Sequence, residues 1–157
     1  MRRKDREIKD ISEIINILNS CKTAHVAMVD KEMPYVVPLS YGYELENAQI
    51  TLYFHSAKEG RKIAILKENN QVCFEISCEG EPLHAAIPCT SGYFYSSIIG
   101  NGQVEFVEDV KEKCRGLSLM FHQQTGRQVE FTEEQAKTVC VFKIISNDFS
   151  GKQKSKG

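Results

Sequence analysis

Apolar residues near the start of the chain recur every three or four positions. Between Glu7 and Asn19 this spacing lines one face of an α-helix. The positions concerned are Ile8, Ile11, Ile15 and Leu18. The segment therefore predicts an amphipathic N-terminal helix, which we place within residues 1–21.

Three segments then alternate apolar and polar residues, the pattern of a half-buried strand. They cover residues 22–29, 33–44 and 49–55, with short polar turns between them. We expect these segments to form an antiparallel meander. Pro34 and Pro38 interrupt the second segment. Because proline lacks the N–H group of a sheet ladder, we expect this strand at a sheet edge or with a bulge.

The rest of the chain predicts two more helices and three more strands. The helices are expected over residues 60–69 and 110–124, and the strands over 71–79, 91–108 and 138–145. Gly100 and Gly102 interrupt the longest of these strands and predict a bulge or a sharp bend. They lack the third glycine and the following helix of a dinucleotide-binding fingerprint, so a bend is the better interpretation.

About six antiparallel strands with helices between them and at the ends predict a mainly β protein with flanking helices, a β+α class. Such a sheet can curl into a small barrel, and the irregular second and fifth strands favour curling. No repeat and no linker divides the chain. We therefore expect one domain over residues 1–157 that ends in a basic tail at 150–157.

Charge and hydropathy narrow the range of partners. The chain has 157 residues, 26% of them charged, and a net charge of −1, which gives no electrostatic reason to bind nucleic acid or an anionic membrane. It has no apolar run of membrane-spanning length, and its first residues, MRRKDREIKD, lack the apolar stretch of a signal peptide. We expect a cytoplasmic protein with neither nucleic acid nor membrane as a partner.

The cysteines and histidines do not show the spacing of a metal site. None of the six cysteines forms a CxxC pair, and the four histidines have no HxxxH or HExxH spacing. We expect reduced thiols, because the cytoplasm is reducing. Cys21, Cys114 and Cys140 lie among apolar residues, where a thiol serves as a small core side chain. His25, on an early strand, is expected to be structural.

The segment LYFHSAKEGRK, residues 52–62, places positive charge where a strand ends and a helix begins. Lys58, Arg61 and Lys62 cluster at the helix N-terminus, where free N–H groups and the helix dipole attract anions. An arginine fork also suits a phosphate group. The residues alone leave two interpretations open: an anion-binding turn, or a solvated basic corner moderated by Glu59.

Four motifs, in order along nearly the whole chain, resemble the flavin-binding split-barrel superfamily typified by pyridoxamine 5′-phosphate oxidase. The likeness is closest to the branch associated with nitroimidazole resistance, the Nim-type proteins. The matching stretches are Pro34–Tyr41 (PYVVPLSY), Tyr53–Lys62 (YFHSAKEGRK), Tyr95–Gly102 and Ser150–Lys152. Arg61 stands where many Nim-type members have histidine, and Ser96 where they often have arginine.

The resemblance implies a six-stranded antiparallel split β-barrel that forms a homodimer with FMN in two clefts between the subunits. It implies contacts to the flavin ring and ribityl chain from the second strand, from the end of the third and from the long bent strand. By position, the residues that would bind FMN are Val37, Pro38, Leu39, Ser40, His55, Ser56, Arg61, Lys62, Ser97, Ile98 and Lys152. Among these, Arg61 and Lys62 would hold the phosphate, and Lys152 would come from the tail.

His55 is the candidate catalytic residue. Tyr53 and His55 alternate with Leu52 and Phe54, so the two polar-tipped side chains share one face of the strand. The resemblance implies that His55 lies near the reactive edge of the flavin. A histidine there could donate a proton to a substrate, because its reference pKa near 6.5 suits proton transfer at neutral pH. The alternative is that His55 only binds or packs against the flavin.

Three functions remain open. The first is an FMN-dependent oxidoreductase that reduces nitro-aromatic or other small electron-poor substrates. The second is a non-catalytic protein that binds flavin or haem, since related split-barrel families bind haem or deazaflavin. The third, a structural or regulatory dimer, leaves the cationic turn unexplained. Pyridoxamine phosphate oxidation is disfavoured, because the sequence shows no second set of cations for a substrate phosphate.

Overall fold

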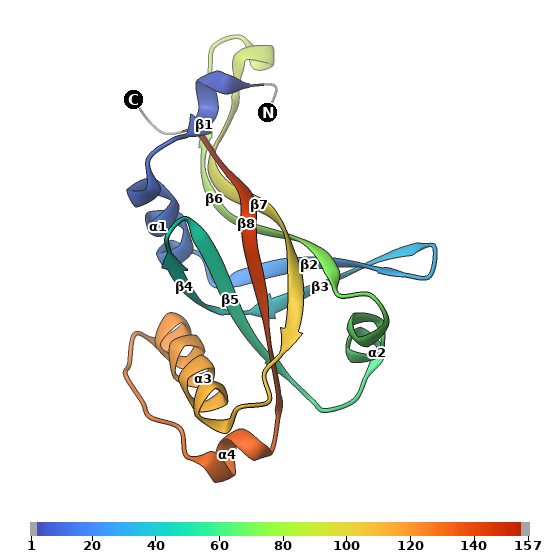
Figure 1. Cartoon of the computed structure of the whole chain (residues 1–157). Helices are drawn as coiled ribbons and strands as arrows, with labels where there is room; N and C mark the ends of the chain where they lie inside the picture. Colours follow the sequence, from blue (N-terminus) through green and yellow to red (C-terminus); the bar gives the residue numbers. More distant parts are fainter. Residues whose placement is uncertain (1–2, 155–157) are drawn as a thin grey trace.

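The computed structural model describes residues 3–154, apart from the side chain of Glu79. Its centre is an eight-stranded sheet with the order β3-β2-β6-β7-β8-β5-β4, and β1 pairs with β8 (Figure 1). Every strand pair is antiparallel. The strands are β1 Glu7–Ile8, β2 Thr23–Asp30, β3 Met33–Ser40, β4 Gly42–Glu46, β5 Gln49–Ser56, β6 Gln71–Leu83, β7 Gly92–Phe106 and β8 Cys140–Lys154.

Four α-helices flank this sheet. They are α1 Ile11–Ser20, α2 Arg61–Glu68, α3 Val110–Thr125 and α4 Glu133–Lys137, with short 3-10 turns at Lys4–Arg6 and Pro88–Thr90. In Figure 1, α3 and α4 lie together at one end of the sheet, α2 lies beside the β2–β3 hairpin, and α1 lies along one side of the sheet above α3. Among residues 3–154, none of the helices combines the length and the apolar character that a membrane span requires.

The mainly β architecture with flanking helices is confirmed, but the strand count is eight rather than six. The expected strand 33–44 breaks at Tyr41 into β3 and β4, and the start of the expected N-terminal helix forms the two-residue strand β1. At the other end, β8 continues to Lys154, so much of the expected basic tail lies in a strand. Residues 155–157 of that tail lie outside the described residues.

Pro34 and Pro38 lie in a part of the sheet where the missing backbone N–H group of proline is tolerated. Pro34 and Pro38 lie on β3, which ends the strand order and therefore has one unpaired edge. The edge position predicted for this strand is confirmed. Among residues 3–154, no ladder joins β3 to β4, so the sheet stays open between them.

A single residue nevertheless connects the two edges of the sheet. β3 ends at Ser40 and β4 begins at Gly42, so Tyr41 alone separates the two outermost strands of the order. A sheet whose opposite edges meet at one residue has to curl back on itself. The ring of Tyr41 is fully buried, and its hydroxyl donates hydrogen bonds to the carbonyl oxygens of Leu18 (2.8 Å) and Cys21 (3.1 Å).

Two apolar clusters make up the interior. The larger lies between the inner face of the sheet and α1, around Phe54, Phe74 and Phe142. The smaller lies between α3, α4 and the β5–β8 pair, and includes Tyr53, Leu117, Met120, Ala136 and Val141. The second cluster fixes the helical end of the molecule, where the candidate site lies.

The expectation that all cysteines are reduced is wrong for one pair. A disulfide joins Cys21, at the end of α1, to Cys78 on β6, with 5.7 Å between their Cα atoms. The two residues are 57 positions apart, and they meet because α1 packs against β6. No sequence spacing indicates this pairing, because the curl of the sheet creates it. The other four cysteines are free thiols.

We predict that replacing Gly42 by alanine destabilises the fold. A Cβ atom at Gly42 would lie 2.6 Å from the carbonyl carbon of Leu119 and 2.8 Å from the Cα of Met120, both in the backbone of α3. The helix would have to move, and such overpacking costs about 1–3 kcal/mol. Urea unfolding should show this loss. Gly92→Ala is the matched control, because its added methyl group would meet only the flexible end of Lys154, and equal stabilities for the two variants would contradict the prediction.

Candidate functional site

Strand β5 divides its side chains between the two clusters. Leu52 and Phe54 are fully buried in the larger apolar cluster. Tyr53 packs in the smaller cluster, next to α3, and His55 faces the same side of the strand as Tyr53. The shared face predicted for Tyr53 and His55 is therefore confirmed. Their surroundings differ, because Tyr53 is 1% exposed while His55 remains accessible.

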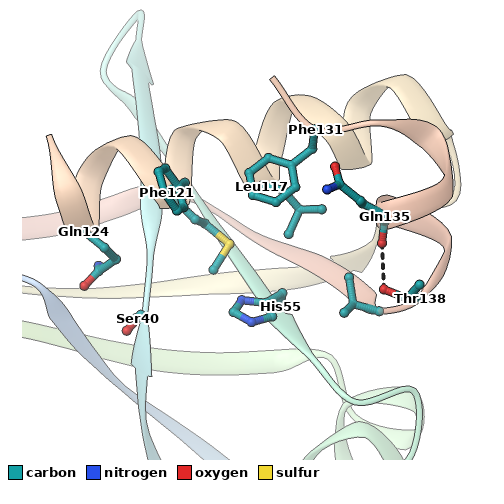
Figure 2. Close-up of a pocket in the computed structure, with 10 residues that line it drawn as sticks. Ser40, His55, Leu117, Phe121, Gln124, Phe131, Gln135 and Thr138 are labelled. Carbon is teal, nitrogen blue, oxygen red and sulfur yellow. Dashed lines mark hydrogen bonds between the residues drawn. The ribbon is translucent and has the colours of Figure 1, made fainter. Parts of the chain in front are cut away.

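His55 opens onto a cavity of about 490 Å³ beneath α3 and α4 (Figure 2). We call this space the α3–α4 cavity. One face of α3 forms its roof, the segment 131–139 closes one side, and the ends of β3 and β5 form its floor. The lining residues are Ser40, His55, Leu117, Met120, Phe121, Gln124, Phe131, Gln135, Thr138 and Val139.

Most polar groups around the α3–α4 cavity are already used by the fold. Gln124 donates to the carbonyl oxygens of Lys22 (2.9 Å) and Tyr41 (3.3 Å). Gln135 accepts from the backbone N–H of Thr132, as part of the capping box of α4. Among the described residues, the side chains of Ser40 and His55 form no hydrogen bond or ion pair. These two groups are therefore available to a ligand.

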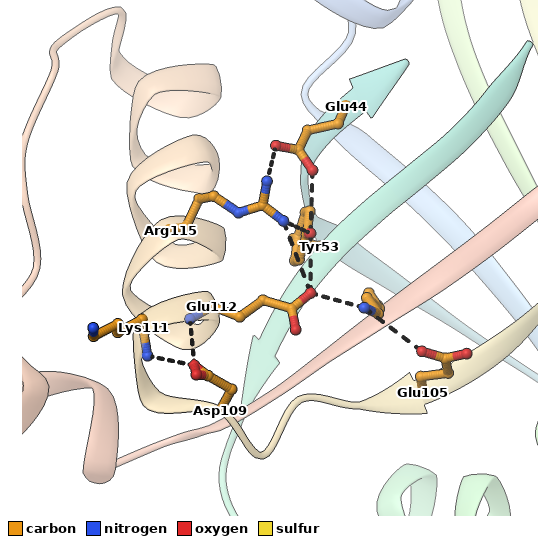
Figure 3. Close-up of polar contacts among 8 residues, drawn as sticks. Glu44, Tyr53, Glu105, Asp109, Lys111, Glu112 and Arg115 are labelled. Atoms are coloured by element: carbon orange, nitrogen blue, oxygen red, sulfur yellow. Dashed lines mark hydrogen bonds and ion pairs between the residues drawn. The ribbon is translucent and has the colours of Figure 1, made fainter. Parts of the chain in front are cut away.

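A partly buried polar network beside the cavity fixes the position of α3 (Figure 3). Arg115 of α3 donates to the hydroxyl of Tyr53 (2.8 Å) and to Glu44 (2.7 Å). The Tyr53 hydroxyl lies 3.2 Å from Glu44 and 3.3 Å from Glu112, and Lys143 donates to Glu112 at 2.7 Å. The network thus ties α3 to β4, β5 and β8.

Tyr53 takes part in this network as a neutral hydroxyl. Burial raises its pKa well above the usual range, and the carboxylate of Glu44 raises it further. The ring also packs closely under α3, since a Cβ atom at Gly116 would lie 2.8 Å from it. The roof of the cavity is therefore held at a fixed distance from β5.

The cationic turn follows the end of β5 that carries His55, where α2 begins. Gly60 is the N-cap, no side chain caps the helix, and its first turn contains no acidic residue. Arg61 pairs with Asp30 through its Nε (3.0 Å) and Nη2 (2.9 Å) atoms and lies 4.2 Å from the centroid of the Tyr35 ring. Free N–H groups, Lys62 and the remaining donors of Arg61 together fit a phosphate group.

The remaining candidates on β3 and β5 have varied surroundings. Val37 and Leu39 pack partly against the main core, while Pro38 and Ser40 are exposed on the edge strand. Ser56 is buried, and its hydroxyl donates to the carbonyl oxygen of Ala57 at 2.7 Å. Backbone groups and exposed side chains at the end of β3 thus lie beside the mouth of the cavity.

Three candidate residues lie far from this group within one chain. Ser97 on β7 pairs with Lys152 on β8, and the neighbouring Ile98 is fully buried in the core. On the same strand β8, Val141 pairs with His55, and Lys152 lies eleven residues further along. At about 3.3 Å per residue along the strand, this separation is roughly 36 Å. One chain therefore divides the candidates into two separate groups.

The sequence did not indicate most of the cavity wall. Phe131 and Gln135 belong to a segment with no periodic pattern, and α4 was not expected at all. Thr138 and Val139 begin the strand expected over 138–145, but nothing in their pattern indicated a cavity wall. The only available sign was on α3, where Leu117, Met120, Phe121 and Gln124 have the spacing of one helix face. That spacing predicts a packed face and does not distinguish a core from a cavity.

Comparison with known proteins places this geometry in a family. A sequence profile described as pyridoxamine 5′-phosphate oxidase matches residues 10–153. A candidate 5-nitroimidazole antibiotic resistance protein from Bacteroides thetaiotaomicron is 32% identical, with a TM-score of 0.80 over 94% of this chain and 86% of that one. No curated protein sequence gives a significant match.

More distant structures share the fold. The flavocytochrome Anf3 from Azotobacter vinelandii is 19% identical, with a TM-score of 0.79 over 99% of this chain and 72% of that chain. An FAD and heme binding protein from Mycobacterium smegmatis is 16% identical, with a TM-score of 0.80 over 96% of this chain and 74% of that chain. These two structures, which are named for their flavin or haem, share the fold alone. The profile match over residues 10–153, together with the 32% identity to the Bacteroides protein, shows that the chain belongs to the pyridoxamine 5′-phosphate oxidase family.

Proposed function

We propose that this protein binds FMN between the subunits of a homodimer and acts as an oxidoreductase on small electron-poor molecules, with 5-nitroimidazole-like compounds as candidates. One observation carries the proposal. The two available polar side chains, Ser40 and His55, open onto an apolar cavity next to a helix start that fits a phosphate. The 32% identity to the candidate nitroimidazole resistance protein supports the choice of substrate.

The separation of the candidate residues supports a dimer. Ser97 and Lys152 lie roughly 36 Å along β8 from His55, too far for one flavin to contact both groups within a chain. A second copy would bring its own Ser97 and Lys152 to the first copy's α2. The sheet also exposes apolar side chains for such a contact, since Val29 is 46%, Val36 54% and Ile99 52% exposed.

Each part of the site has a distinct role in this proposal. Lys62, Arg61 and the free N–H groups of α2 hold the phosphate, and the backbone of residues 37–40 borders the ring system. When bound, FMN supplies the electron transfer, and the protein supplies orientation and electrostatics. Arg61 has a second role, because its ion pair with Asp30 holds the β2–β3 hairpin against α2.

His55 is placed to transfer a proton. It is accessible, has no hydrogen-bond partner among residues 3–154, and faces the cavity from a rigid strand. A proton donor at this point would protonate a substrate oxygen as electrons reach the substrate. A histidine that only contacts the flavin would occupy the same position, so the two roles have to be separated by kinetics.

The absorption spectrum of the purified protein tests the cofactor. We expect flavin bands in the visible blue, two FMN per dimer and a dimer in sedimentation experiments. A haem Soret band would instead indicate the haem-binding alternative, and a colourless protein that takes up no added flavin would remove both. A stable monomer with fully bound FMN would contradict the interface site.

We predict that Arg61→Ala combined with Lys62→Ala weakens FMN binding much more than riboflavin binding. Each charge-assisted contact to the phosphate contributes about 1.5–3 kcal/mol, and riboflavin has no phosphate to lose. Flavin fluorescence titration measures both affinities.

Two controls separate the effects of these substitutions. Lys67→Ala removes a lysine at the far end of α2 and should change neither affinity. Asp30→Asn breaks the ion pair but keeps Arg61, so it reports on the hairpin contact alone. If the double variant still prefers FMN over riboflavin as strongly as the parent, the phosphate is held elsewhere.

We predict that His55→Gln retains FMN but slows substrate reduction by about 10²-fold, the usual contribution of a general acid. Glutamine keeps a hydrogen-bonding side chain of similar size and cannot supply the proton. Rapid mixing of the reduced protein with a nitro-aromatic compound measures the rate. An unchanged rate would leave His55 without a chemical role, and loss of FMN would make it a cofactor ligand.

A further inference from the structure

The ten residues around the α3–α4 cavity include no lysine, arginine, aspartate or glutamate. His55 is the only ionisable group among them. Five of the ten are apolar, namely Leu117, Met120, Phe121, Phe131 and Val139. Arg127 lies 6.0 Å from the centroid of the Phe121 ring but does not line the cavity.

A charged ligand would enter this cavity at a high cost. A carboxylate or phosphate that leaves water needs a cation or several donors, and without them the transfer is strongly unfavourable. The amide N–H groups of Gln124 and the amide oxygen of Gln135 already have partners, as described above. The side chains of Ser40 and His55 and the amide N–H groups of Gln135 remain, and these few donors can serve a neutral hydrogen-bond acceptor but do not replace a lysine or arginine.

The shape of the cavity is also fixed by the fold. Gly42 and Gly116 bring α3 into close contact with β4 and with the Tyr53 ring, and the Arg115 network holds the helix there. Phe121 and Phe131 meet edge to face, with 6.0 Å between their ring centroids. A cavity of about 490 Å³ with such walls has the size of a typical small-molecule site.

We infer that the α3–α4 cavity selects an uncharged, largely apolar aromatic molecule of one or two rings that carries one hydrogen-bond acceptor, and that it excludes anionic aromatics. This inference rests on the proposed function, because it makes the cavity the place where the electron-accepting substrate lies beside the flavin. It assigns substrate selection to side chains of α3 and of the segment 131–139. Phosphorylated and carboxylated compounds are rejected there, because the lining holds no lysine or arginine and His55 is the only side chain in it that could carry a positive charge.

The chain contains no tryptophan, so a single introduced tryptophan reports on the cavity directly. We would use Phe121→Trp in the protein as purified and titrate two probes of similar size, 4-nitrobenzyl alcohol, which is neutral, and 4-nitrobenzoate, which is an anion. Nitro-aromatic compounds quench tryptophan on contact. We expect saturable quenching by the alcohol, and only the weak linear quenching of random collisions by the carboxylate.

Three further variants control this experiment. Tyr93→Trp places the reporter on β7 at a 62% exposed position away from the cavity, where both probes should quench linearly. Adding Leu117→Phe to the reporter variant fills the cavity and should remove the saturable phase. Thr138→Lys adds a cation to the wall and should improve binding of the carboxylate by about tenfold or more. Circular dichroism confirms that each variant folds.

The outcomes separate the inference from the proposed function. Equal saturable quenching by both probes, or saturable quenching that survives Leu117→Phe, would overturn the inference. Linear quenching by both probes in a protein that contains flavin would overturn it while leaving the proposed function intact. Selective quenching by the alcohol in a protein that takes up no flavin would support the cavity's selectivity and remove the proposed oxidoreductase activity.

Discussion

The close approach of four elements at Tyr41 and Gly42 determines the shape of this molecule. Tyr41 joins the two edge strands of the sheet, and its hydroxyl satisfies two carbonyl groups at the end of α1. Gln123 of α3 donates to the same two carbonyls, at 2.6 and 2.9 Å. Buried helix ends need such partners, because unpaired carbonyl groups are costly away from water. One set of hydrogen bonds therefore holds the curled sheet together and also fixes the positions of α1 and α3.

The geometry of the candidate site depends on these contacts around Tyr41 and Gly42. Gly42 sets how near α3 comes to β4, Gly116 sets how near it comes to Tyr53, and the Arg115 network prevents the helix from sliding. The space that remains under α3 is the cavity beside His55. A histidine on a strand and a helix held by partly buried ion pairs give a site whose parts are positioned before any ligand arrives.

The sequence predicted the parts of the molecule that follow local rules. The apolar spacing located α2 and α3 closely, and the alternation in LYFHS placed Tyr53 and His55 on one face. The motif resemblance led to the correct family. The cationic residues Arg61 and Lys62 do lie at the start of α2, but the partner of Arg61, Asp30, is 31 positions away and could not be inferred from spacing.

What the sequence did not predict depends on contacts made only by the curled sheet. The Cys21–Cys78 disulfide and the cavity walls each join segments that are distant in the chain. The division of the expected strand at Tyr41 likewise follows from the curl of the sheet. α4 has five residues and one buried side chain, too little for a periodic pattern. The extension of β8 past Ile145 was missed because Asn147 and Asp148 interrupt its alternation with exposed polar groups.

The short strand β1 has a practical consequence for engineering. Glu7 and Ile8 pair with Lys152 and Gly151 of the last strand, so the beginning and the end of the described chain are neighbours at the end of the sheet opposite α3 and α4 (Figure 1). Joining them by a short peptide and opening the exposed turn at Asn47 and Ala48 would give a circularly permuted protein with the same sheet order.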